Sequence, residues 1–186
     1  MGLTYLPGTS LPDTSADRSA FSQMEPLLAA TGGLSLSQVA AVTGLEGSTI
    51  QNWVKRGWVP KPVGKKYGET QLARILIISA LRDCMQLEQI AKLLAYVNGQ
   101  VEDRSDDIIG ESQLYNYLCA IVRRMRPEEG LSLAKVRQLV GEETAGYSGP
   151  TPDAAGRLEK ALTVMALACH AGRIKNLAEE LLHELT

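Results

Sequence analysis

The amino-acid sequence predicts an all-α fold with one small β hairpin. Over most of the 186 residues, apolar side chains recur at intervals of three and four, the spacing that brings them onto one face of a helix. The exception is Val59–Tyr67, a basic segment broken by two prolines and a glycine. This segment is too interrupted for a helix, so we expect a hairpin there with its turn near Val63-Gly64.

Residues 1–33 are predicted to form an N-terminal arm and one short helix. Residues 1–19 are rich in Pro, Gly, Ser, Thr and Asp, a composition typical of an extended arm. A helix is expected at Phe21–Ala30, although Pro26 falls inside it, and Gly32-Gly33 would end it. One side of this helix would carry its apolar residues, Phe21, Met24, Leu27 and Leu28.

Two capped helices are predicted next. Ser35–Gln38 is a capping box, in which the hydroxyl and the amide satisfy each other's free backbone N–H groups, and the helix would stop at Gly44. Ser48–Gln51 repeats the pattern and would begin the second helix. Its inner stripe is Ile50, Trp53 and Val54. We expect Trp53 to be buried against the core residues Leu36, Val39, Leu72 and Ile75, because a ligand-contacting helix needs a rigid back wall.

The rest of the chain is predicted to be helical. Apolar helices are expected at Glu69–Cys84 and Leu87–Val97, and the acidic segment Gln100–Gly110 would be a linker. The helices expected after it are Ser112–Met125, Ser132–Leu139, Asp153–Ala171 and Arg173–Leu185. We therefore divide the chain into an arm (1–33), a helix-turn-helix domain with a wing (34–99) and a C-terminal helical domain (100–186).

Charge is unevenly distributed along the chain, although its net charge is only −2. Between Ser35 and Arg82 the only acids are Glu46 and Glu69. The bases in the same stretch are Lys55, Arg56, Lys61, Lys65, Lys66, Arg74 and Arg82. Acidic residues gather after Val101 instead. This separation favours a local surface that binds a polyanion.

Three segments together resemble the MerR-type regulators. Thr49–Pro60 is similar to that family's recognition helix and helix-to-wing junction, Lys66–Ile75 to the end of its wing and its third helix, and Leu87–Leu94 to its fourth helix. The wing is short, and Gln51 stands where the family commonly has an arginine that contacts DNA phosphate. The chain looks more like an uncharacterised bacterial MerR-like family known only as a domain of unknown function, so no biological role carries over.

The likeness to the MerR-type regulators, and not the one to the uncharacterised family, implies a bacterial, cytoplasmic transcriptional regulator that binds double-stranded DNA as a homodimer. The candidate DNA-binding residues are Ser48, Thr49, Gln51, Asn52, Lys55, Arg56, Lys61, Lys65, Lys66 and Tyr67. Asn52 has the carboxamide that pairs with adenine, and the lysines suit phosphate. Each of four of these residues has an alternative role without DNA. Ser48 and Gln51 would be helix caps, Asn52 a solvated surface residue, and Tyr67 part of the core.

Dimerisation is expected through the C-terminal half, since the apolar faces of three helices there are too broad to be covered in one small bundle. These faces lie on Ser112–Met125, Asp153–Ala171 and Arg173–Leu185, and the equal alternative is that they cover one another within one protomer. The same half would otherwise supply a pocket for a small-molecule effector.

Other classes of function find little support in the sequence. No membrane span or secretory signal is visible, and the separated Cys84, Cys119 and Cys169 are expected to be reduced core thiols. His170 and His183 lack ligand spacing, so we predict no catalytic residue, no metal site and no cofactor. The alternative function is a helical protein–protein interaction module on a winged scaffold that no longer binds DNA. A positive surface broken by Glu46 and Glu69 would favour that alternative.

Overall fold

The computed structural model describes residues 5–14, 19–125 and 131–185. These residues form an all-α fold, as predicted, with isolated β bridges but no strand in the described ranges. The elements in chain order are the 3-10 helix η1 (Ala20–Gln23) and the helices α1 (Glu25–Thr31), α2 (Leu36–Thr43), α3 (Gly47–Lys55), α4 (Glu69–Leu81), α5 (Leu87–Asn98), α6 (Glu111–Arg124), α7 (Leu133–Thr144) and α8 (Ala154–His183).

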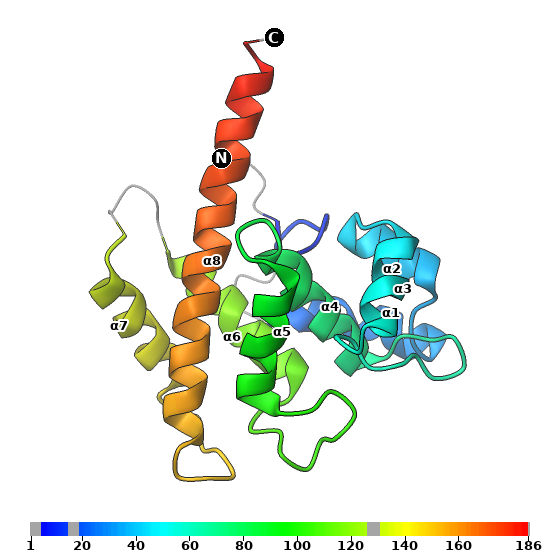
Figure 1. The fold of residues 1–186 in the computed structure, drawn as a ribbon, viewed down its shortest axis with the longest axis horizontal. Helices are drawn as coiled ribbons and strands as arrows, with labels where there is room; N and C mark the ends of the chain where they lie inside the picture. Colours follow the sequence, from blue (N-terminus) through cyan, green and yellow to red (C-terminus); the bar gives the residue numbers. More distant parts are fainter. Residues whose placement is uncertain (1–4, 15–18, 126–130, 186) are drawn as a thin grey trace.

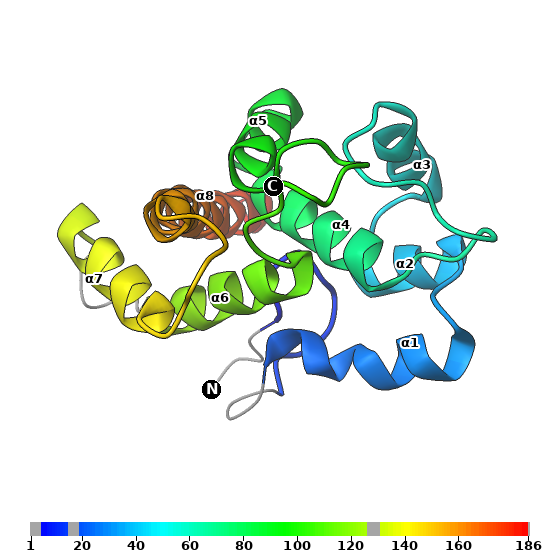
Figure 2. The same ribbon diagram turned by 90° about the horizontal axis from the view of Figure 1, so that it is seen from below.

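The helix α4 lies at the centre of the molecule. The helices α2 and α3 are at one end, and α6, α7 and α8 are at the other (Figures 1 and 2). Because α4 packs on α2, α5, α6 and α8, its buried side chains join both ends into one hydrophobic core. That core contains residues from Leu6 in the arm to Cys169 in α8. Residues on both sides of the predicted domain boundary at position 99 therefore share it. The division into domains 34–99 and 100–186 stays a prediction.

The described part of the arm is a folded loop and not an extended segment. The Leu6 N–H donates to the Leu11 carbonyl (3.0 Å), and the Leu6 side chain is buried. The Ser10 N–H donates to the Val42 carbonyl at the end of α2 (3.0 Å), and the Tyr115 hydroxyl donates to the Pro7 carbonyl (2.7 Å). The arm is thereby tied to both ends of the molecule.

The helix predicted at Phe21–Ala30 is divided between η1 and α1. Pro26 has no N–H to continue a helix from η1, but it is accommodated in the first turn of α1. Phe21 and Met24 are buried as expected, and the Phe21 ring packs edge-on against Tyr115. Leu27 is 39% exposed, so it does not share the burial of Phe21 and Met24.

The cap predicted for α2 is confirmed, whereas the cap predicted for α3 is wrong. The Gln38 N–H donates to the Ser35 hydroxyl (3.3 Å), and the Ser35 N–H donates to the Gln38 side-chain oxygen (2.8 Å). The helix α3 begins earlier than expected, because Glu46 has extended backbone and its carbonyl already accepts the first helical hydrogen bonds. Ser48 therefore lies inside the first turn, and neither Ser48 nor Gln51 is a cap.

The loop that contains Lys65 turns where the hairpin was predicted. The N–H and carbonyl groups of Val63 and Lys66 exchange hydrogen bonds of 3.0 and 2.9 Å around Gly64 and Lys65. Both central residues have positive φ (+56° and +64°), as a type I′ turn requires. Only isolated bridges form at Val63–Lys66 and at Leu34–Tyr67, so this part of the described chain has no two-stranded sheet.

The two helices predicted on either side of Gly172 are one continuous helix, α8. Gly172 does not end it, because an interior glycine costs a helix only about 1 kcal/mol. At this position α8 passes close to Asp83: a Cβ added to Gly172 would lie 3.4 Å from the Asp83 Cβ. The first half of α8 is buried in the core, and the half after Gly172 projects beyond the other helices (Figure 1).

The segment Gln100–Gly110 is a closed loop and not an open linker. The Asn98 side chain donates to the Ile109 carbonyl (2.8 Å) and accepts from the Ile109 N–H (3.3 Å), which brings the ends of the loop together. Ile108 and Ile109 are buried. Within the described ranges, no helix combines the length and the apolar character needed to cross a membrane.

Candidate nucleic-acid interface

The helix α3 is held in place by its apolar face. Ile50 and Trp53 are buried there, Trp53 with only 1% of its surface exposed, which confirms the prediction of its burial. The Trp58 N–H donates to the Trp53 carbonyl (3.0 Å) and turns the chain back toward the core after α3. The residues expected behind Trp53 belong to the same core or pack against it: Leu36, Val39, Leu72 and Ile75.

The opposite face of α3 is polar and accessible. Its exposed residues are Ser48, Gln51, Asn52, Lys55 and Arg56, and Thr49 is half-buried. Because the apolar face fixes the helix, these side chains have a defined direction away from the core. An exposed helix with carboxamide and cationic side chains has the chemistry needed to contact base edges and phosphates in a major groove.

The segment Val59–Tyr67, which we call the lysine-bearing loop, adds cationic groups after α3. Lys61 and Lys65 are exposed, with Lys65 at the tip of the type I′ turn, and Lys66 is half-buried. Tyr67 is buried, and burial raises the pKa of its hydroxyl. Its N–H and carbonyl pair with those of Leu34 at 2.8 Å. The ring of Tyr67 therefore closes the core, which agrees with the alternative weighed for this residue.

Acidic residues border the cationic groups. The Arg56 guanidinium lies 3.5 Å from the Glu88 carboxylate and 5.0 Å from the centre of the Trp58 ring. The backbone N–H of Lys61, not its ammonium group, donates to the Glu102 carboxylate at 3.5 Å. Glu46 is exposed at the beginning of α3. The sequence did not predict that Glu88 and Glu102 lie near Arg56 and Lys61. These acids come from α5 and the loop after it, and their spacing in the sequence gives no sign of the contacts.

A buried ion pair supports the junction between α3 and the loop. Arg74 and Glu111 form this pair, each with 4% of its side chain exposed. The Arg74 Nε also donates to the Trp58 carbonyl (2.6 Å), so the pair links α4 and α6 to the end of the candidate helix. Arg74 is one of the bases from which the sequence predicted a polyanion-binding surface. Because its side chain is buried, it is not part of that surface. A charge so deeply buried requires its partner.

The described residues show no cluster of three or more His, Cys, Asp or Glu side chains suited to a metal ion. His170 is buried; burial lowers its pKa, and the nearby positive charge of Arg173 lowers it further. His183 is exposed. Cys119 and Cys169 are buried free thiols, as expected, whereas Cys84 is exposed because it follows the end of α4.

Comparison with known proteins gives two matches. Residues 32–118 match the sequence model of a family described as a domain of unknown function (DUF1836), a stretch that begins before α2 and ends within α6. The chain is also 28% identical over 115 residues to the uncharacterized protein YkrK of Bacillus subtilis (strain 168), which covers 59% of this chain and 49% of YkrK. The chain thus spans about half the length of this curated relative.

No solved structure matches the chain. Neither sequence match has a link to MerR-type regulators, so that resemblance rests on the residues alone and stays a prediction. The expected similarity to a domain of unknown function is confirmed. The exposed face of α3, the lysine-bearing loop and the buried Arg74–Glu111 pair all lie within residues 32–118, which match DUF1836.

Proposed function

We propose that the chain is a sequence-specific, DNA-binding transcriptional regulator of the MerR-like winged helix-turn-helix type, acting as a dimer. The observation that carries the proposal is the orientation of α3. Its apolar face is fixed in the core at Trp53, while Asn52, Lys55 and Arg56 are exposed, as is Lys65 at the tip of the turn that follows α3 in the chain. In this arrangement α3 enters the major groove and the loop acts as a short wing on the adjacent phosphates.

The roles of the side chains follow from their chemistry. The Asn52 and Gln51 carboxamides suit base edges, since each can donate and accept a hydrogen bond with adenine. Lys55, Lys61 and Lys65 suit phosphates, which position the protein without reading sequence.

The dimer is proposed to form through the second half of α8. Its large apolar residues follow Ile174 at three, seven, eight and eleven positions, and all of them are 54–82% exposed: Ile174, Leu177, Leu181, Leu182 and Leu185. Such an apolar stripe on a helix normally has a partner. The apolar face predicted on α6 is covered within one protomer, because Leu114, Leu118 and Ile121 are buried. It therefore does not serve the proposed dimer.

Charge favours an antiparallel second copy as that partner. Arg173 and Lys175 lie at the beginning of the exposed half of α8, whereas the acids Glu179, Glu180 and Glu184 lie toward its end. Antiparallel pairing would bring the basic part of one helix beside the acidic part of the other. Parallel pairing would place like charges together.

A second candidate is the protein-binding module on the same scaffold. It is favoured by the acids near these residues: Glu88 lies 3.5 Å from the Arg56 guanidinium, and Glu102 accepts from the backbone N–H of Lys61 at 3.5 Å. A partner protein with mixed charge would suit such a surface better than uniformly anionic DNA.

One experiment separates the two candidates. Fragmented genomic DNA is incubated with the full purified chain, and the bound DNA is recovered and sequenced. The proposal expects a recurring short sequence in the bound fraction and loss of that enrichment with Asn52→Ala. The matched control is Gln138→Ala, which removes an exposed carboxamide from α7. Absence of any recurring sequence from the bound DNA of the unmodified chain would overturn the DNA proposal in favour of the protein-binding module.

A further inference from the structure

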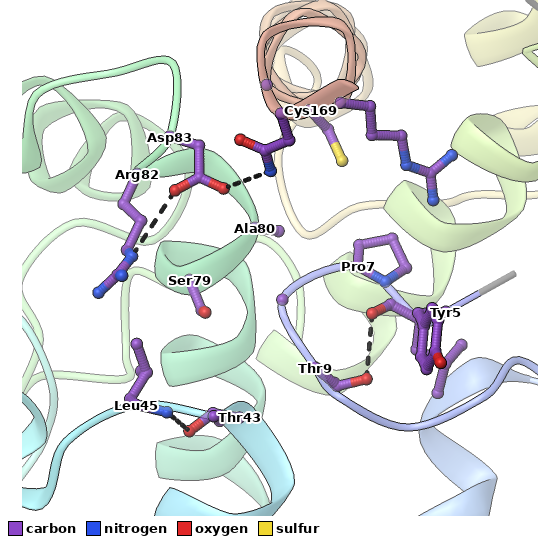
Figure 3. A pocket seen from close by; sticks show the side chains of 16 residues that line it. Tyr5, Pro7, Thr9, Thr43, Leu45, Ser79, Ala80, Arg82, Asp83 and Cys169 are labelled. Atoms are coloured by element: carbon purple, nitrogen blue, oxygen red, sulfur yellow. Dashed lines mark hydrogen bonds and ion pairs between the residues drawn. The ribbon is translucent and has the colours of Figure 1, made fainter. Parts of the chain in front are cut away.

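A cavity of about 580 Å³ lies where the arm, the turn between α2 and α3, the end of α4 and the middle of α8 meet (Figure 3). Its size is in the range of small-molecule sites. Pro7 and Thr9 come from the arm, Thr43 from the end of α2, Leu45 from the turn before α3, Arg82 and Asp83 from the turn after α4, and Cys169 from α8. None of these residues belongs to the candidate DNA-binding face.

The wall formed by the arm is fixed by close backbone packing. Gly8 has φ +72°, and a Cβ at this position would lie 2.2 Å from the Leu76 carbonyl oxygen and 2.9 Å from the Ala80 nitrogen. No side chain other than hydrogen allows the arm to lie so close to α4. The Ser10 hydroxyl also bonds to the Ala41 carbonyl at 3.0 Å. The cavity is therefore part of the folded architecture.

The charges around the cavity leave one cation without a partner. The Asp83 carboxylate has two partners: it pairs with the Arg82 guanidinium at 3.8 Å and accepts a hydrogen bond from the Asn176 side-chain amide at 3.2 Å. Arg173 also lines the cavity, and within the described ranges it has neither an ion pair nor a hydrogen bond. Its charge reaches the cavity wall, since it lowers the pKa of the Cys169 thiol against the larger, raising effect of burial.

We propose that this cavity binds a small organic anion, with its carboxylate or phosphate on Arg173 and its apolar part against Leu6, Pro7 and Leu45. A guanidinium pairs such groups with two parallel hydrogen bonds, which makes it a specific acceptor of anions. The Ser79 hydroxyl is a further hydrogen-bonding group in the wall.

The position of the cavity gives the anion a regulatory role, and this part rests on the proposed function. Thr43 ends α2 and Leu45 lies in the turn that leads to α3, and the Leu45 N–H donates to the Thr43 hydroxyl at 3.2 Å. Arg173 begins the exposed half of α8, where the dimer is proposed. An anion that touches both elements changes the spacing of the two α3 helices in a dimer and hence the affinity for DNA.

The binding step is tested without DNA. Benzoate and phenyl phosphate are titrated into the full chain, with the neutral benzamide as control, and backbone amide shifts of Gly44, Leu45 and Gly172 are followed by NMR. We expect saturable shifts with at least one anion, at a Kd on the order of 1 mM for so small a probe, and none with benzamide. Benzoate and phenyl phosphate together tell which anionic group is preferred.

Two variants locate the site. Arg173→Gln should weaken binding about tenfold, the loss of one charge-assisted pair, while Arg137→Gln on the exposed surface of α7 should leave it unchanged. Equal shifts with benzamide, no saturable shift with either anion, or equal affinities of both variants would overturn the site.

The regulatory step is then read from DNA affinity with and without the bound probe. A change of severalfold in the unmodified chain that is absent in Arg173→Gln supports regulation, and no change overturns it. If the chain binds no DNA at all, the proposed function fails while the NMR titration still decides the anion site.

Discussion

At the scale of residues, the Arg74–Glu111 ion pair is deeply buried and joins three parts of the molecule. It fixes α4 to α6 and holds the Trp58 carbonyl beyond the end of α3. The second carboxylate oxygen of Glu111 is buried and has no hydrogen-bond partner among the described residues. Arg74 therefore has to compensate the carboxylate largely alone, and the two charges depend on each other.

Replacing one member of the buried pair should lower the free energy of unfolding far more than replacing one member of an exposed ion pair. Glu111→Ala leaves the Arg74 charge buried and uncompensated, so the free energy of unfolding should fall by about 3–5 kcal/mol. The control is Arg124→Ala, which breaks the exposed pairs with Glu142 and Glu143 and should cost less than about 1 kcal/mol. Urea denaturation followed by circular dichroism measures both changes, and similar values would contradict the structural role of the buried pair.

The three cysteines should differ in reactivity. Burial raises the pKa of the Cys119 thiol to about 12 and also raises that of Cys169, so neither forms the reactive thiolate in the folded protein. Cys84 is exposed. Mass spectrometry after iodoacetamide treatment at pH 8 should find rapid modification of Cys84 alone. In urea all of them should react. Native modification of Cys119 at the rate of Cys84 would contradict its burial.

At the scale of elements, Trp53 is the larger of the two buried side chains that anchor α3, the other being Ile50. Trp53→Ala should lower the free energy of unfolding by about 3–5 kcal/mol, the range for truncating a buried aromatic residue. Trp58→Ala is the control, because Trp58 is only half-buried and should cost less. Thermal and urea denaturation provide the measurement. A loss of less than 1 kcal/mol with Trp53→Ala would mean that α3 is anchored elsewhere.

The lysine-bearing loop should contribute charge and not sequence preference. On the DNA that the chain enriches, affinity should fall with salt at a log–log slope of about −0.9 per phosphate contact. Replacing Lys65 and Lys66 with Ala should weaken all sequences alike and reduce the slope by about 2 on the same rule. The double variant Lys135→Ala/Lys160→Ala, on α7 and α8, is the matched control. A slope unaffected by the loop lysines would remove the wing from the proposed interface.

The sequence predicted the elements whose signals are local. The Ser35 capping box marks the beginning of α2, and the glycine after Val63 marks the turn of the loop. It failed where the residue type does not mark the boundary: Glu46 begins α3 through its backbone conformation, and α8 continues through Gly172 because one interior glycine costs a helix little. Of the site, the outward face of α3 follows from periodicity. The acidic neighbours Glu88 and Glu102 do not, since only the fold brings them near.

At the scale of the whole molecule, the exposed half of α8 should control association. Leu177→Lys combined with Leu181→Lys places charges in the apolar stripe, so a dimer that depends on it should dissociate. Sedimentation velocity at micromolar concentration should show a dimer for the unmodified chain and a monomer for this variant. Leu133→Lys, at an exposed leucine of α7, should remain dimeric. A monomeric unmodified chain would rule the arrangement out.

The hydrogen bond from Tyr115 to the Pro7 carbonyl has a consequence for synthesis of the chain. These residues are 108 positions apart. At translation rates of about 5–20 residues per second, the arm therefore waits roughly 5–20 s after leaving the ribosome before its partner emerges. During this interval α2 and α4 can fold, but Leu6 has only part of the surroundings that bury it. Closure of the arm against α6 is thus a late event, and it couples the first residues of the described chain to the completion of the helical end.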